Sequence, residues 1–510
     1  MELTESLAKM EFILGKLDAC KATNREVLFR AKSVDVKVKS LLTEIEVREA
    51  AHEANEMILA SRKVLEIFEI PLPTKVSPLR ILFKVRKVRA LLNRKTDEQI
   101  LMLPCSNDND SRMSIALCIL VRLAAYSFSN QGVHLGVYCA LLATELSLTK
   151  GLVPYTSAAV AVFGIVELSL GQNKRAYRLG ELSLKLFSHV PCKSAECFSV
   201  SRFIGNLLFL KLRFGDFCDL YVKNFNSSVE IGDFFSAGYS ATAFSLLQIW
   251  RGMNLKAMEE SILQVYRRVN DSGKDIFVMV LKPLLQFVLN MQSESEELEE
   301  LSVLTGEIMN EEEFISQNTC DKNSAYMTVF LLCKQKLLYT LGLYERAHII
   351  CEEIKGWNFI MAEHGGFSLP YHFYFAMISY SLYHSTGLRK HRRTARKCKK
   401  YIVRQHFSIG NPNAMAYLKI MEVEEFFSRR RPSPKIMRQI CDSAIEFQVK
   451  EDFPTLEAIA NERAHQVLGE LNYLSSEDSY LNQAIDVCRY KWGATAKSKL
   501  LLRRQELMGV

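Results

Sequence analysis

A local pattern of apolar and polar positions recurs along the chain. A leucine-rich helical stretch ends at a glycine, and five residues later a small or apolar side chain opens a second helix. Glycine past the last helical turn adopts the left-handed conformation, and the small residue lets the returning helix approach closely. The pattern therefore predicts helix–turn–helix repeats of roughly 34–45 residues. The copies lie around Gly171 and Ala176, Gly215 and Leu220, Gly252 and Ala257, and Gly342, Tyr344 and Ala347, with a weaker copy at Gly15 and Cys20.

The clearest single helix lies near the end of the chain. Its apolar side chains recur at i, i+3, i+4, i+7 and i+11, in the order Leu481, Ala484, Ile485, Cys488 and Trp492. Gly493 follows and is expected to end the helix. No segment alternates with the period of a strand over a useful length. We therefore predict an all-α fold, a tetratricopeptide-like α-solenoid of stacked antiparallel helix pairs.

Changes in composition divide the chain into five regions. The prolines at 71 and 73 end a helix predicted over 48–68, and a strongly basic helix is predicted over 79–95. The expected regions are N-terminal repeats (1–70), a basic helix and polar loop (71–110), central repeats (111–290), an acidic connection (291–325) and C-terminal repeats (326–510).

The composition is sufficient for a continuous apolar core and indicates an intracellular protein. The 510 residues are 48% hydrophobic, and 13 cysteines without a CxxC motif suit core positions in a reducing compartment. The N-terminus has acidic residues where a signal peptide would be basic, and the apolar stretch 151–166 is too short to span a bilayer. We expect a cytoplasmic protein without a transmembrane segment. A nuclear location is an alternative, because the basic clusters could bind an import receptor.

Several stretches resemble one family of proteins. They read LASRKVLEIFEIPLPTKVSPLRILFKVRKVRALLNRKTDEQILMLP, YTSAAVAVFGIVELSLGQNKRAYRLGELSLKLF, GDFFSAGYSATAFSLLQIWRGMNLKAMEES, MNEEEFISQ, PYHFYFAMISYSLY and TLEAIANERAHQVLG…YLNQAIDVCRYKWGATAKSKL. The most specific positions are Ala460-Asn461-Glu462, Arg489-Tyr490 and Trp492-Gly493-Ala494. Together they resemble, over residues 10–498, the tetratricopeptide-like helical region of multidomain signalling proteins of bacterial and protist type. Those proteins join this region to a kinase-like domain, a P-loop ATPase and a sensor histidine kinase; soluble adenylyl cyclases have a related arrangement with less specific similarity.

The catalytic motifs of that family are absent from the sequence. No GxxxxGK[ST] loop, kinase HRD or DFG motif, or recognisable phospho-acceptor histidine box occurs. His364 and His372 lie near Glu363, but a glycine-rich connection explains them better than a metal or acid–base site. The aromatic run from Tyr371 to Tyr383 is typical of core packing between repeats. We therefore predict no enzyme, no catalytic or metal-binding residue, no cofactor and no small-molecule substrate.

Basic clusters are the sharpest candidates for function. The densest comprises Arg389, Lys390, Arg392, Arg393, Arg396, Lys397, Lys399, Lys400 and Arg404. A second comprises Arg429, Arg430, Arg431 and Lys435, and a third Arg80, Lys84, Arg86, Lys87, Arg89, Arg94 and Lys95. Such density suits a solvated helix face, an acidic protein partner, an import receptor, nucleic acid or anionic lipid. Few aromatics accompany the densest cluster, which makes nucleic acid a weak candidate.

The leading hypothesis is a non-catalytic scaffold that mediates protein–protein interaction. The resemblance implies a role in signal transduction with an ATPase or kinase module as partner. A second hypothesis is a fragment or split subunit of a multidomain ATPase or sensor histidine kinase. A weaker third is a basic-patch binder of nucleic acid or an anionic membrane surface.

Overall fold

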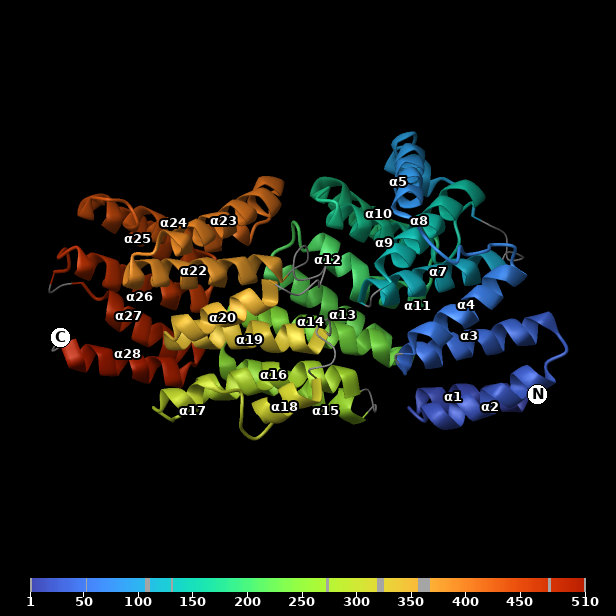
Figure 1. Cartoon of the computed structure of the whole chain (residues 1–510), viewed down its shortest axis with the longest axis horizontal. Helices are drawn as coiled ribbons and strands as arrows, with labels where there is room; N and C mark the ends of the chain where they lie inside the picture. The colour runs from blue at the N-terminus through green and yellow to red at the C-terminus, as the bar shows by residue number, and fades with distance from the viewer. Residues whose placement is uncertain are drawn as a thin grey trace. The chain divides into compact units, whose positions relative to one another are not determined.

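The fold is all-α, as the sequence predicted. A computed structural model describes residues 2–51, 53–105, 111–129, 132–271, 275–318, 325–355, 367–475 and 478–508. Over these ranges the regular structure is helical, apart from one isolated β-bridge between Cys105 and Leu152. Successive helices pair antiparallel and stack on their neighbours (Figure 1). This is the arrangement that a helix–turn–helix repeat needs in order to bury its apolar faces.

The chain divides into two compact units. The first comprises Met1–Leu208, Lys223–Tyr239 and Val269–Lys274. Its helices are α1 (Glu2–Ile13), α2 (Leu17–Arg30), α3 (Val34–Ala50), α4 (Ala54–Ile67), α5 (Pro78–Asn93), α6 (Asp97–Leu101), α7 (Ser111–Ser129), α8 (Val133–Lys150), α9 (Thr156–Ser169), α10 (Asn173–His189), α11 (Lys193–Ser199), the π-helical turn η1 (Val200–Ile204) and α12 (Gly205–Leu208).

The second unit comprises Phe209–Val222, Ser240–Arg268 and Asp275–Val510. Three helices contribute residues to both units: α13 (Phe214–Glu230), α14 (Phe234–Arg251) and α15 (Leu255–Asp271). The others in this unit are α16 (Asp275–Gln292), α17 (Leu298–Ser302), α18 (Glu311–Asn318), α19 (Ala325–Leu341), α20 (Tyr344–Lys355), α22 (Ser368–Thr386), α23 (Arg389–Gln405), η2 (Phe407–Ile409), α24 (Ala414–Phe427), α25 (Pro434–Lys450), α26 (Pro454–Glu470), α27 (Tyr480–Asp486), the π-helical turn η3 (Val487–Trp492) and α28 (Thr495–Met508).

Five of the predicted helix-ending glycines have the left-handed conformation. The φ angles are +75° at Gly15, +71° at Gly171, +76° at Gly252, +81° at Gly342 and +80° at Gly493. Each lies between two helices, where a side chain would be strained. The small residues Ala176 and Ala347 are buried in the helices that follow two of these turns, and Tyr344 opens one of them. The repeat pattern is confirmed at these positions.

Two positions of the predicted pattern are wrong. Gly215 lies in the first turn of α13 and is not among the glycines with positive φ, because the preceding helix already ends at Leu208. Ala257 is exposed, and Leu255 and Met258 make the close contacts of α15 instead.

One predicted helix boundary is also wrong. The helix expected over 48–68 is interrupted, since α3 ends at Ala50 and α4 begins at Ala54. The apolar periodicity continues across this break, which is why the sequence pattern did not reveal it.

The core of the second unit contains the aromatic run of α22. Phe373, Tyr374, Phe375 and Tyr380 are buried, as predicted for packing between repeats. A buried cation, which the sequence did not reveal, lies among the same aromatics. The Lys336 ammonium group lies 5.6 Å from the Trp250 ring centroid, 5.8 Å from that of Trp492 and 6.0 Å from that of Tyr374.

 

The lysine in this aromatic cluster stabilises a helix end. Its ammonium group donates a hydrogen bond to the carbonyl oxygen of Ile249, near the C-terminal end of α14. Lys336 is 1% exposed. Burial lowers the pKa of Lys336 to about 7 because removal from water disfavours the charged form, and only the field of Cys333 opposes this effect.

Gly252 offers the sharpest test of the repeat geometry. A Cβ atom there would lie 2.3 Å from Thr455 Oγ1 and 2.8 Å from the Thr455 backbone nitrogen. We expect Gly252→Ala to combine left-handed strain with this clash and to lower the free energy of unfolding by about 2–4 kcal/mol. Chemical denaturation followed by circular dichroism measures the change.

The matched control for this substitution is Gly387→Ala in the same unit. Gly387 has a φ of +69° but no atom within 4 Å of a built Cβ. Its cost is the backbone strain alone, about 1–2 kcal/mol. Equal costs for the two substitutions would show that Thr455 does not constrain the turn.

Candidate functional site

The densest basic cluster forms one face of α23. The opposite face of this helix is buried and carries His391, Ala395, Cys398 and Ile402, at i, i+4, i+7 and i+11. That face packs in the hairpin with α22, whose turn is Gly387. The buried stripe therefore fixes which side chains of α23 point outward.

The outward side of α23, here called the cationic face, contains the nine predicted cations. Arg392 and Lys399 are half-buried, and the Arg392 guanidinium lies 5.6 Å from the centroid of the Tyr383 ring. The other seven are exposed: Arg389, Lys390, Arg393, Arg396, Lys397, Lys400 and Arg404. The structure thus brings all nine residues to one helix, as the sequence predicted.

One carboxylate anchors the cationic face to its neighbour. Glu425 on α24 accepts a 2.5 Å hydrogen bond from Lys399 Nζ, and Arg396 Nε lies 4.0 Å away from the same carboxylate. Partial burial alone would raise the pKa of Glu425, but Lys399 and Arg396 outweigh it and lower the pKa. The remaining exposed cations of α23 form no ion pair with a carboxylate of the described residues.

The second basic cluster lies at the same end of this helical layer. Because α24 runs antiparallel to α23, its C-terminal end lies near Arg396 and Lys399. Arg429, Arg430 and Arg431 follow that end directly and are exposed. The structure therefore extends the cationic face with a second, loop-borne group of arginines.

The third basic cluster has a different environment in the first unit. Lys84 and Lys87 of α5 bind Glu145, at 2.5 and 2.6 Å. Arg89 forms two hydrogen bonds to the buried carboxylate of Glu167, at 2.8 and 2.9 Å. These three cations attach α5 to its own unit, so they serve the fold.

A buried ion pair lies in the core directly behind the carboxylate that binds the cationic face. Glu424, the neighbour of Glu425 in sequence, is fully buried and accepts hydrogen bonds from the Arg463 guanidinium on α26. His384 Nε2 of α22 lies 3.3 Å from the same carboxylate. Burial alone would raise the pKa of Glu424, but Arg463 and His384 outweigh it and lower the pKa. The sequence analysis missed these residues because no local pattern marks a pair 39 positions apart.

Three of the family-like positions near the C-terminus, Asn461, Glu462 and Trp492, have structural roles, whereas Arg489 and Tyr490 are exposed. Buried Asn461 donates to the backbone oxygen of Glu457, and Glu462 binds Lys497 at 2.8 Å and Arg504 at 2.9 Å. Trp492 is buried beside Lys336. These contacts explain the local sequence through packing, without a catalytic arrangement.

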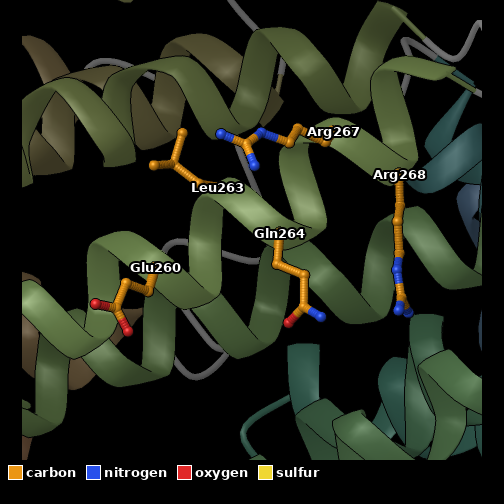
Figure 2. Close-up of a pocket in the computed structure, with 5 residues that line it drawn as sticks. All are labelled: Glu260, Leu263, Gln264, Arg267 and Arg268. Atoms are coloured by element: carbon orange, nitrogen blue, oxygen red, sulfur yellow. The ribbon is translucent and has the colours of Figure 1, made fainter.

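Two hollows lie in the described part of the second unit. One of about 440 Å³ lies beside α15, where the side chains fan out along a single helix (Figure 2). Its lining residues are Glu260, Leu263, Gln264, Arg267 and Arg268. A buried cavity of about 10 Å³ beside Tyr344 and Arg463 has room for one water molecule at most.

The histidine candidates are only partly described. His372 stacks on Tyr401 with ring centroids 3.8 Å apart, while Glu363 and His364 lie outside the described residues. Over the described ranges, no three His, Cys, Asp or Glu side chains are grouped as metal ligands. None of the helices in those ranges has the length and apolarity that a bilayer crossing requires.

The buried ion pair gives a stability test. We expect Glu424→Gln to leave the Arg463 guanidinium buried without its counter-ion and to cost about 3–5 kcal/mol. Glu425→Gln, which affects a partly exposed pair, should cost less, about 1 kcal/mol. Urea denaturation of the two variants measures the difference, and equal costs would contradict the role given to Glu424.

The same pair predicts a dependence on pH. Because the folded-state pKa of Glu424 lies below its ordinary value of 4.5, its contribution to stability is present above that pH and is lost as the pH falls through the folded-state pKa. Glu424→Gln should remove this part of the acid sensitivity, and thermal melts between neutral and acidic pH would show it.

Comparisons with known proteins do not assign the chain to a family. No family model matches the sequence, and no curated protein matches it. Among solved structures, the TPR domain of P58(IPK), determined by crystallography at 2.5 Å, aligns at 11% identity over 84% of this chain and 98% of that chain. The TM-score of 0.18 is too low for this alignment to support a statement about fold or function.

Proposed function

We propose that this chain is a non-catalytic scaffold that binds a protein partner through the cationic face of α23. The observation that carries the proposal is a row of exposed cations on a helix whose other face is fixed in the core. Arg393, Lys397, Lys400 and Arg404 follow one another at spacings of four, three and four residues. They form a line of about 16 Å along the helix.

An acidic protein segment fits this line of charge. Regularly spaced carboxylates on a helix or an extended peptide can pair with successive cations, and complementary charge accelerates and orients association. Arg429, Arg430 and Arg431 would lengthen the same surface. A fixed helix also presents its charges at a lower entropic cost than a mobile tail.

The environment of Tyr401 favours a protein over nucleic acid. It is the tyrosine of α23, and its ring stacks on His372 at 3.8 Å with an interplanar angle of 7°. A base would have to displace His372 from that face before stacking on it. Phosphate contacts alone would give little preference for any nucleic-acid sequence.

The wider role of the scaffold is proposed from the sequence resemblance alone. That resemblance points to signal transduction, with an ATPase or kinase module as the partner, or to this chain as part of such a protein. The absence of their catalytic motifs from the sequence supports a role in holding such a module rather than replacing it. Identification of the bound partner would separate these possibilities.

Charge reversal on the cationic face tests the proposal. We expect K397E/K400E/R404E to weaken binding of the captured partner more than tenfold, because attraction becomes repulsion along the line. Affinity capture with mass spectrometry identifies proteins that wild type retains, and biolayer interferometry with the purified partner measures the affinity. Binding should also weaken as salt rises.

The matched control changes the net charge equally at another place. K32E/K37E/K39E alters three exposed lysines around α3 and should leave the affinity unchanged. A partner that binds wild type and K397E/K400E/R404E equally would overturn the assignment of the cationic face.

A further inference from the structure

We propose that the outward face of α5 binds the surface of an anionic lipid bilayer. This helix lies at the edge of the first unit and packs on α8, projecting beyond its neighbours (Figure 1). Val85, Val88 and Leu92 form its buried stripe. The other side of α5 is left without a covering helix among the described elements.

Large apolar side chains lie on that uncovered side. Leu79 is 68% exposed, Leu82 46% and Phe83 66%. They occupy positions i, i+3 and i+4 in the first two turns, so they form one contiguous patch. Exposed leucines and phenylalanines grouped in this way mark a binding surface more often than isolated ones do.

Positive charge surrounds the apolar patch. The sequence from residue 70 to residue 96 contains no Asp or Glu. Lys84, Lys87 and Arg89 are held by carboxylates of the same unit. Arg86 and Arg94 are exposed and form no ion pair within the described residues, so Arg86 keeps a positive charge next to the patch and Arg94 keeps one at the C-terminal end of α5.

The combination of these features selects a bilayer as the occupant. A basic amphipathic helix that presents Leu and Phe can insert these side chains at the boundary between headgroups and acyl chains, while Arg and Lys bind anionic headgroups. A projecting helix suits a flat surface, whereas a peptide ligand needs a groove to bury its own apolar side chains. The cationic face of α23 differs, because its exposed large apolar surface comes from Val403 and not from a group of Leu and Phe side chains.

Sedimentation with vesicles tests this inference on the full chain. One set contains phosphatidylcholine alone, and the other contains phosphatidylserine and phosphatidylcholine in equal parts. We expect wild type to bind the anionic vesicles and to leave the neutral ones largely free. L79S/F83S should weaken the partition about tenfold or more, because the inserted side chains are lost.

Matched controls distinguish the contribution of the outward face of α5 from general changes in hydrophobicity, charge or folding. L3S/L7S removes two exposed leucines of α1 and should leave vesicle binding unchanged. R86E/R94E tests the charge without touching the apolar patch and should weaken binding to anionic vesicles. Circular dichroism confirms that each variant is folded.

Two outcomes would overturn the proposal. Wild type that does not prefer anionic vesicles would exclude the bilayer as the occupant of this face. Vesicle binding by L79S/F83S equal to that of wild type would place the contact elsewhere on the chain. Neither result bears on the protein partner of α23, whose test uses different residues.

Discussion

The arrangement around the cationic face depends on two adjacent glutamates of α24. Consecutive residues on a helix point about 100° apart, so one carboxylate of the pair can enter the core while the next faces the neighbouring helix. Glu424 enters the core and pairs with Arg463 of α26. Glu425 pairs with Lys399 of α23. A single step along α24 therefore connects the core of the second unit to its most highly charged surface.

The second unit contains several buried cations, and different groups stabilise the charge of each one. Arg463 has a carboxylate, and Lys334 Nζ lies 2.6 Å from Glu311 and 2.7 Å from the carbonyl oxygen of Ser302. Lys336 has aromatic rings and a helix-end carbonyl instead, and burial lowers its pKa to about 7. Polar groups in a core cost stability unless they are paired. A shift of one helix along another would separate these cations from their partners, so the pairs restrict how the helices can pack.

The basic clusters of α23 and α5, which look equivalent in sequence, have different environments in the structure. On α23 most of the cations are exposed, because its buried stripe is made of small or uncharged side chains. On α5 three cations bind Glu145 and Glu167, and the exposed apolar patch gives that helix a second chemistry. A high density of charge along the sequence therefore indicates a candidate surface. It does not indicate how many of those cations pair with carboxylates of the same chain.

The sequence by itself determined the class of fold and the positions of many helix ends. Left-handed glycines such as Gly342 and apolar stripes such as the one that ends at Trp492 are local features, so the local sequence was enough to predict them. The tertiary structure decided what depends on distant partners: the exposure of Ala257, the burial of Lys336 and the pairing of Glu424 with Arg463. Each of these depends on which helices meet, and the period of a single helix does not contain that information.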